Sequence, residues 1–296
     1  MRKRLILALG GVLLLAGFVV DASPDTGVAE FVGKTRWQED HEKFGGLSGM
    51  EIGANGADLI VISDRGRIFK AGISRTDGIV TDIAVRSDLI MLNPSATRLT
   101  RKQRDPEGLA IGQDGAIYVS YENDTRIWQF STLSTAPTPM PDHPAFEDMP
   151  KNGGLEALAI DAGGALYTLP EIGESRTGPI PVYRFNDGTW DQPFSLTRRG
   201  PYLPVGADFG PDGKFYVLER HFTGFTGFRT RVRRFDVAEG AVKNEEVLLT
   251  TSAGRHDNLE GLSVWRDDAG AIRLTMVSDD NFVMFQQTEL VEYRVP

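Results

Sequence analysis

The sequence contains no cysteine and only four histidines among its 296 residues. This absence excludes disulfide bonds, thiolate nucleophiles, iron–sulfur clusters and cysteine-bound zinc. The four histidines show no metal-ligand spacing either. The fold must therefore be held by its hydrophobic core, and any metal site must use oxygen ligands.

Basic residues are fewer than acidic ones, with 32 Lys and Arg against 41 Asp and Glu, and the net charge is −9. Nucleic acids are bound by basic faces, so we expect no nucleic-acid partner. No glycine-rich phosphate or dinucleotide motif is present. The stretch Gly46-Leu47-Ser48-Gly49-Met50 lacks the second glycine of a serine-hydrolase turn. Small ligands, cations and esters remain as candidate ligands or substrates.

Long apolar runs are absent except at the beginning of the chain. Arg2-Lys3-Arg4 precedes the apolar stretch Leu5–Val20, and Val20-Asp21-Ala22 fits a signal-peptidase site. We therefore expect residues 1–22 to be a cleaved signal peptide, residues 23–296 to be one domain, and the protein to be periplasmic or secreted. No stable membrane span should then remain. The alternative is an uncleaved N-terminal anchor, although this stretch is short for a bilayer span.

Glycine and proline are plentiful, and the glycines mark an internal repeat of roughly fifty residues. Each unit has a short apolar segment, a polar turn that ends in glycine, and a second β-rich run. The second and fourth units have the hairpin turns Gln113-Asp114-Gly115 and Pro211-Asp212-Gly213. The five units begin at Ser48, Glu107, Glu156, Val205 and Glu260.

The repeat predicts an all-β fold, a β-propeller of five four-stranded blades. The last unit has only three strands before the chain ends, so residues Glu30–Glu39 should supply the strand that closes the last blade. Six blades remain possible if Thr81–Arg101 hides a degenerate unit. In the fourth unit, Arg229, Arg231 and Arg233 alternate along a strand, which we interpret as a solvated outer face.

Acidic residues recur at equivalent positions of the repeat. The first strand of a blade lines the central channel and the second strand returns, so the start of one and the end of the other lie at one mouth of the channel. The first-strand positions are Ser48, Glu107, Glu156, Val205 and Glu260, and the second-strand positions are Asp64, Glu122, Glu171, Glu219 and Asp279. We expect them around one opening, with Asp105, Glu51, Asp208 and Asp280 as acidic neighbours.

Carboxylates that crowd one opening raise each other's pKa values, and a cation would relieve that repulsion. Oxygen ligands favour a divalent metal, most simply calcium. The predicted metal ligands are Asp64, Glu107, Glu156, Glu260, Asp279 and Asp280. The alternative is that these acids are solvated or bind turn amides.

Basic groups accompany the acids. Arg65, Arg104 and Arg220 each adjoin an acidic residue, and with Ser48 they are our candidates for binding a phosphate or carboxylate group. The alternative is that each arginine pairs with its acidic neighbour in sequence. The predicted catalytic residues are Glu107, Glu156 and Glu260, with His221 as an acid–base candidate.

The chain resembles the phytase-like family named for "esterase-like activity of phytase". The resemblance is carried by boxes between residues 45 and 281, above all Asp105-Pro106-Glu107-Gly108-Leu109 and Asn258-Leu259-Glu260-Gly261-Leu262. The other boxes are Gly45-Gly46-Leu47-Ser48-Gly49, Ser63-Asp64-Arg65-Gly66, Gly154-Leu155-Glu156-Ala157-Leu158 and Ser278-Asp279-Asp280-Asn281. The resemblance implies an exported, hydrolase-like propeller. Val205 departs from the pattern, because it occupies a glutamate position.

Three functions fit these observations. The first is a metal-dependent hydrolase that acts as a monomer on a small anionic or ester substrate, a phosphoric or carboxylic ester. The second is a non-catalytic propeller that binds a ligand or a partner of the cell envelope. The third is a lactonase-type propeller hydrolase with one central metal. Sensitivity to a chelator separates the hydrolases from the binding protein.

Overall fold

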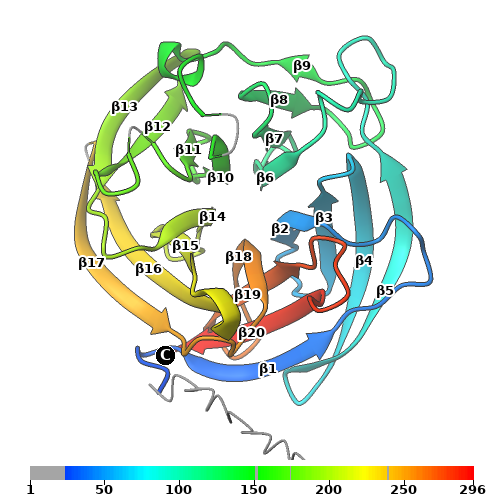
Figure 1. Ribbon diagram of the computed structural model, residues 1–296, viewed down its shortest axis with the longest axis vertical. Coiled ribbons are helices and arrows are strands. Elements are labelled where there is room, and N and C mark those ends of the chain that lie inside the picture. Colours follow the sequence, from blue (N-terminus) through cyan, green and yellow to red (C-terminus); the bar gives the residue numbers. More distant parts are fainter. Residues whose placement is uncertain (1–23, 151–152, 174, 239) are drawn as a thin grey trace, which may run out of the picture.

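The structure is a computed structural model that describes residues 24–150, 153–173, 175–238 and 240–296. It is a ring of five four-stranded antiparallel sheets, with the sheets arranged as blades around a central channel (Figure 1). The expected signal peptide, residues 1–22, lies outside the described residues. In the described part, the only helices are the short 3-10 turns η1 (Pro144–Phe146) and η2 (Gly224–Thr226). No helix there has the length and apolarity that crossing a membrane requires.

Each blade begins with its strand at the channel and proceeds outward. The first two blades are β2 (Leu47–Ile52), β3 (Asp58–Ser63), β4 (Arg67–Thr76) and β5 (Ile79–Ile90), then β6 (Pro106–Ile111), β7 (Ile117–Tyr121), β8 (Arg126–Phe130) and β9 (Thr138–Pro139). The third and fourth are β10 (Leu155–Ile160), β11 (Leu166–Pro170), β12 (Ile180–Asn186) and β13 (Thr189–Leu196), then β14 (Leu203–Phe209), β15 (Phe215–Phe222), β16 (Phe228–Ala238) and β17 (Ala241–Thr250).

The fifth blade joins the two ends of the described chain. It contains β18 (Asn258–Arg266), β19 (Ile272–Asp279) and β20 (Glu289–Val295), and β1 (Glu30–Arg36) is its outermost strand. β1 pairs antiparallel with β20 in a register that places Glu30 opposite Arg294. The predicted blade count and the predicted closure are both confirmed. Residues 81–101 hold no sixth blade, because they form most of β5 and the beginning of a long loop.

A glycine follows the first position of four of the five units, the exception being Ala157 in the third, and it has a packing role. The innermost strands of neighbouring blades approach so closely that a Cβ atom on Gly261 would lie 2.2 Å from the carbonyl oxygen of Ser48. A Cβ atom on Gly206 would lie 2.6 Å from the carbonyl oxygen of Glu260. No real side chain tolerates such contacts, so glycine is required at these two positions, where the blades converge on the channel.

The core lies between adjacent blades. Leu218 of the fourth blade and Leu262 and Met276 of the fifth belong to one buried cluster. Similar apolar clusters fill the other interfaces. Because the blades pack face to face, the start of every innermost strand is held at one end of the channel.

The alternating arginines of β16 correct one of our interpretations. Arg231 and Arg233 are buried, and Arg233 has no exposed surface. Both pair with Glu219 of β15, where the Nε atoms of Arg231 and Arg233 lie 2.6 and 3.0 Å from Oε2. The predicted solvated face is wrong, because a buried carboxylate on the neighbouring strand compensates both charges.

Candidate functional site

The three glutamates at the starts of the inner strands face one another. Glu107, Glu156 and Glu260 line the same cavity of about 10 Å³ in the channel, where the fourth blade contributes the apolar side chain of Val205. A cavity of this size holds about one water molecule or one ion. The repeat therefore placed these carboxylates correctly relative to each other.

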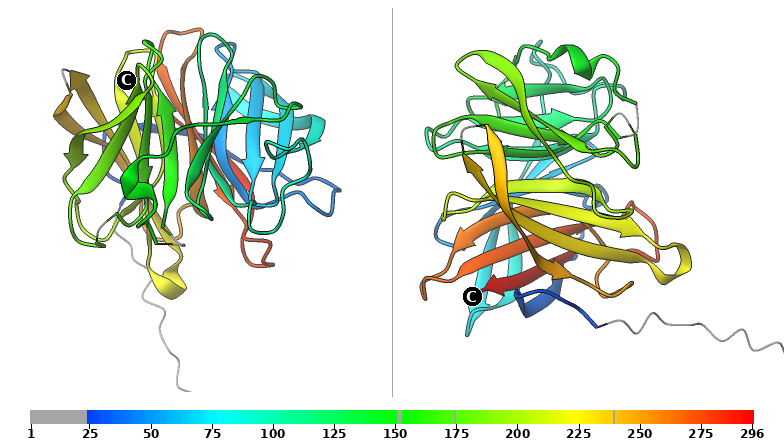
Figure 2. Two further views of the ribbon diagram at one scale, coloured as in Figure 1. Left: turned by 90° about the horizontal axis from the view of Figure 1, so that it is seen from above. Right: turned by 90° about the vertical axis from the view of Figure 1, so that its left-hand side faces the viewer.

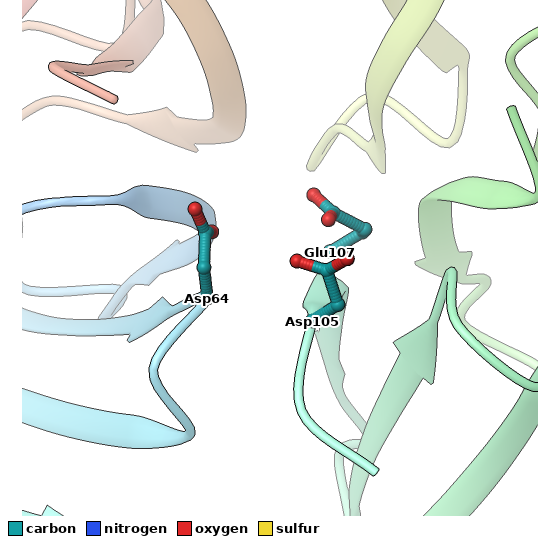
Figure 3. Close-up of side chains that lie close together, drawn as sticks. All are labelled: Asp64, Asp105 and Glu107. Carbon is teal, nitrogen blue, oxygen red and sulfur yellow. The ribbon is translucent and has the colours of Figure 1, made fainter. Parts of the chain in front are cut away.

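Three carboxylates converge at the opening of this channel. Asp64 follows β3, Asp105 precedes β6 and Glu107 lies within β6 (Figure 3). One carboxylate oxygen of each residue lies within 4.8 Å of those of the other two. The backbone N–H of Asp105 donates to the carbonyl oxygen of Asp64 at 3.2 Å, which ties the two connections together. We call Asp64, Asp105, Glu107, Glu156 and Glu260 the acidic mouth.

Two of these carboxylates are positioned by neutral hydrogen-bond donors. The Ser48 hydroxyl donates to Oδ1 of Asp64 at 3.1 Å, and the Asn123 amide donates to Oδ2 of Asp105 at 2.6 Å. The carboxylate of Glu107 has no hydrogen-bond or ion-pair partner in the described part of the chain. No basic side chain there pairs with Asp64 or Asp105 either, so the trio has no counter-charge of its own.

Burial and mutual repulsion raise the pKa values at the acidic mouth. Burial, then the charges of Glu260 and Asp105, raise the pKa of Asp64 to about 7. Burial, then the charge of Glu156, raise that of Glu107 well above its usual value. A cation bound among these carboxylates would stabilise their ionised form.

The other side of the acidic mouth is partly neutralised by one arginine. The Arg220 guanidinium donates to Glu260, to the Asn258 amide oxygen at 2.6 Å and to Glu171 at 3.3 Å. Burial raises the pKa of Glu260, while the charge of Arg220 opposes this rise. The positive charge of Arg220 is thus shared between two blades' glutamates.

Glu156 and Asp279 complete the ring of acids. Burial, then the charges of Glu122 and Glu171, raise the pKa of Glu156 well above its usual value. Burial, then the charge of Glu260, raise the pKa of Asp279 to about 9. Both side chains are buried. The acids predicted at strand ends therefore interact across blades 1, 2, 3 and 5.

Three predicted site residues occupy other surroundings. Asp280 accepts hydrogen bonds from the backbone N–H groups of Gly46 and Phe282, at 3.0 and 3.1 Å, so its carboxylate caps loops. His221 packs against the Tyr202 ring, and burial lowers its pKa. Glu219 is held by the buried arginines of β16 and does not line the channel cavity.

The predicted arginines do not pair with the acids beside them in sequence. Arg65 lies over the ring of Phe282, 3.4 Å from its centroid, and Arg220 pairs across the blades as described. Arg104 contacts no carboxylate in the described part of the chain. The sequence alternative of local acid–arginine pairs is therefore wrong for all three.

The donor set fits a hard divalent cation. Asp64, Asp105 and Glu107 offer oxygen atoms alone, at a spacing that one cation can bridge, and they are only partly buried. Calcium accepts six to eight such ligands in flexible geometry. From the sequence we expected Asp105 only as a neighbour of the mouth. The signal that could have placed it in the site was its position two residues before Glu107, in Asp-Pro-Glu.

A wide cleft of about 1260 Å³ opens beside the acidic mouth. It reaches from Glu171, Arg220 and Asn258 to apolar side chains on two projecting segments. These are Phe222, Phe225 and Phe228, at and between the adjoining ends of β15 and β16, and Val283 and Phe285 of the β19–β20 connection. These two segments extend from the same side of the ring (Figure 2). The mouth is therefore accessible from a space of ligand size.

Glu51 and Asp208, which we expected beside the mouth, lie instead at the opposite end of the channel, because each stands near the end of its innermost strand. There they form a second, simpler acid pair. Burial and the nearby charge of Asp208 raise the pKa of Glu51 well above its usual value. The Ser263 hydroxyl donates to Glu51 at 3.3 Å, and the backbone N–H of Val264 donates to Asp208 at 2.6 Å. Both carboxyls accept hydrogen bonds from groups of the fold, so we interpret them as a structural pair. The acidic mouth can be compared with this pair.

Comparison with family models gives one match. The model described as "Esterase-like activity of phytase", a phytase-like family, matches residues 42–282. All five residues of the acidic mouth lie inside that range. Comparison with curated protein sequences gave no match.

Solved structures with related folds have low sequence identity. A PQQ-bound aldose sugar dehydrogenase from Streptomyces coelicolor is 12% identical, with a TM-score of 0.48 over 89% of this chain and 98% of that one. A gluconolactonase from Xanthomonas campestris is 16% identical, with a TM-score of 0.45 over 83% of this chain and 72% of that one. A protein of unknown function from Dyadobacter fermentans is 10% identical, with a TM-score of 0.47 over 91% and 100%. At these values the likenesses do not bear on function.

Proposed function

The chain belongs to the phytase-like family, and from this premise we propose that it is a hydrolase of phosphoric or carboxylic esters with its site at the acidic mouth. The observation that carries the proposal is the convergence of Asp64, Asp105 and Glu107, whose carboxylate oxygens lie within 4.8 Å of one another. Glu156 and Glu260 line the adjoining cavity. Unpaired carboxylates in so small a volume need a counter-charge.

Asp64, Asp105 and Glu107 would hold a divalent cation, and calcium suits their oxygen atoms best. When bound there, such a cation supplies Lewis-acid polarisation of an ester oxygen and lowers the pKa of a water molecule. Ser48 keeps the Asp64 carboxylate aimed at the opening through its hydrogen bond of 3.1 Å. Glu156 is our candidate for accepting the proton of the attacking water, because it lines the same cavity from the neighbouring blade.

Arg220 has an electrostatic role in this proposal. It compensates Glu171 and Glu260, and so reduces the negative potential that an anionic substrate would meet. His221, the acid–base candidate from the sequence, packs against Tyr202, and this proposal assigns it no step. We also propose that the protein works as a monomer in the periplasm or outside the cell on a small ester.

The experiment combines metal analysis with activity. Purified protein is analysed for bound metal, stripped with chelator, and assayed on 4-nitrophenyl phosphate and 4-nitrophenyl acetate before and after calcium is returned. We expect chelation to abolish hydrolysis of one ester and calcium to restore it. Glu156→Gln, which removes the proposed proton acceptor, should reduce kcat by about a hundredfold or more. Glu107→Gln, which removes a proposed metal ligand, should abolish the restoration of activity by calcium.

The matched control is Glu51→Gln at the opposite end of the channel. It makes the same chemical change in a buried carboxyl whose pKa is also raised, but far from the proposed site. It should leave activity unchanged. Activity that survives both the chelator and Glu107→Gln would exclude the proposed mechanism, and ligand binding without hydrolysis would favour a binding propeller.

A further inference from the structure

A second cavity, of about 300 Å³, lies next to the acidic mouth and has the opposite charge. Its polar lining is entirely basic, with Ile90, Met91 and Leu99 as the apolar part. We call this cavity the basic pocket. Its basic side chains are Lys43, Arg65, Arg67, Arg98 and Arg104. So much positive charge in one place is unexpected in a protein of net charge −9.

Part of this charge is already compensated. Arg67 makes a two-pronged contact with Asp88, with Nε 2.7 Å from Oδ1. Lys43 lies 3.6 Å from Glu42 on the surface, an exposed pair that contributes little. One Arg65 nitrogen donates to the backbone oxygen of Glu42 at 3.3 Å, which leaves the charge of Arg65 without a carboxylate.

Arg98 and Arg104 are the uncompensated groups. Both are exposed, and neither forms an ion pair or side-chain hydrogen bond in the described part of the chain. With Arg65 they give the pocket three guanidinium groups that have no carboxylate partner there. Guanidinium groups bind oxyanions such as phosphate and carboxylate through paired N–H donors.

The backbone fixes this pocket against the acidic mouth. Arg65 follows Asp64 and Arg104 precedes Asp105, so two residues of the pocket are bonded to two residues of the acidic trio. The hydrogen bond from Asp105 N–H to the Asp64 carbonyl joins the two segments, and Met91 N–H donates to the Gly66 carbonyl at 2.9 Å. An anion in the pocket would therefore lie beside the carboxylates.

The pocket also accounts for an irregularity of the repeat. The connection between the first and second blades, residues 91–105, is longer than the connection between the third and fourth, residues 197–202. The longer connection is ordered by Asn93, whose side-chain oxygen accepts from the N–H groups of Ser95 and Thr97 at 3.0 and 3.1 Å. The additional residues of the first unit thus build one wall of the pocket.

We propose that the basic pocket is an oxyanion subsite, which holds a phosphate or carboxylate group of the substrate next to the ester bond that is cut. The inference has two halves, oxyanion binding and the assignment of the bound group to the substrate. The second half rests on the proposed function. It narrows the substrate class to esters that carry an anionic group. The first half, oxyanion binding, stands on the pocket alone.

The decisive measurement is calorimetric titration of inorganic phosphate into protein that has been stripped of metal and freed of chelator. We expect the parent to bind phosphate, and Arg98→Gln/Arg104→Gln to bind it about tenfold more weakly or worse, because two charge-assisted contacts are lost. Binding should weaken as salt is added. The control is Arg101→Gln/Lys102→Gln, which removes the same charge from the same loop outside the pocket and should retain the parent's affinity.

Equal phosphate affinity in the parent and the pocket variant, or no binding by the parent, would overturn the proposal. A parallel titration with acetate compares the two oxyanion classes, and the one bound more tightly identifies the group that the substrate carries. Because the acidic mouth is free of metal in this experiment, its result does not depend on the hydrolase proposal.

The substrate half is tested with two esters that differ in one anionic group, mono(4-nitrophenyl) succinate and 4-nitrophenyl butyrate. The pocket variant should raise KM about tenfold for the succinate ester, with kcat little changed, and leave both constants unchanged for the butyrate ester. Equal effects on both esters would contradict a substrate subsite. If the parent hydrolyses neither ester, it is the hydrolase proposal that fails for these substrates, and phosphate binding alone decides the pocket.

Discussion

The guanidinium of Arg220, on the fourth blade, is bonded to the carboxylate of Glu260, on the fifth. The same arginine reaches Glu171 of the third blade at 3.3 Å. One side chain thus connects three blades at the place where the repeat replaces glutamate with Val205. The irregular unit contributes a cation to the ring of acids instead of a further anion.

Removal of this cation should destabilise the protein in a pH-dependent way. At pH 8, we expect Arg220→Gln to lower the free energy of unfolding by about 3 kcal/mol, because it leaves Glu171 and Glu260 without their counter-charge. At pH 5 the loss should be smaller, since burial raises the pKa of Glu260 and a protonated Glu260 needs no partner. Urea unfolding at the two pH values measures both. Arg294→Gln, which breaks the exposed pair with Glu30, should cost less than about 1 kcal/mol at either pH, and an equal loss in the two variants would contradict this account.

The stability of the metal-free protein should fall as the pH rises. A carboxyl whose pKa is higher in the folded than in the unfolded state binds its proton more tightly when folded, so its contribution is complete below the unfolded value and is lost on passing through the folded value. The relevant windows are from about pH 4 to about 7 for Asp64 and from about pH 4 to about 9 for Asp279. For Asp64 this amounts to about 4 kcal/mol, at 1.36 kcal/mol per pH unit.

Calcium should reverse this loss at high pH, because it binds the ionised carboxylates. At a hundred times its dissociation constant, it would add about 2.7 kcal/mol to the free energy of unfolding. Thermal melts at pH 5 and pH 8, with calcium or chelator, test this for the parent and for Glu107→Gln, Glu156→Gln and Glu260→Gln. If calcium leaves the parent's melting temperature unchanged while the glutamine variants melt higher, the acids merely repel one another.

The buried pair of arginines on β16 gives a prediction that is independent of the mouth. Glu219→Gln removes the charge that compensates Arg231 and Arg233, both buried, and should cost about 3 to 5 kcal/mol. Glu246→Gln is its matched control on the same blade, because Glu246 is an exposed partner of Arg234. We expect a loss below about 1 kcal/mol there. Denaturant unfolding of the two variants should separate them, and similar losses would show that burial has been misjudged.

The fold was largely predictable because its signal is periodic. Turns such as Gln113-Asp114-Gly115 recur at each hairpin, and the missing fourth strand of the last blade required residues near Glu30. The channel-lining glutamates followed from the same alignment. Side-chain partners across blades did not, because periodicity gives the position of a residue and not the group it meets. Arg231 and Arg233 show this, since alternation is the same for a solvated face and for a face that a buried Glu219 compensates.

The site was predictable to a lesser degree for the same reason. Glu107 was found from its position in the repeat, whereas Asp105 joins the trio through a connection whose shape no repeat specifies; its backbone adopts a left-handed φ of 83°. The pocket formed by Arg98 and Arg104 depends on the fold of residues 91–105, a connection between blades whose shape the repeat does not specify. Features that break the repeat are the ones that sequence periodicity leaves out.

The pairing of Glu30 with Arg294 means that the last blade can be completed only after both β1 and β20 have been synthesised. The ribosome delivers the first of these residues long before the second, so β1 must wait without its partner until β20 has been synthesised. Contacts this distant in sequence are slow to form, and unpaired strand edges invite aggregation meanwhile. The ring consequently cannot close before β20 has been made. Any fragment that ends before β20 leaves β1 without its strand partner, so the propeller cannot be shortened from its C-terminal end without being opened.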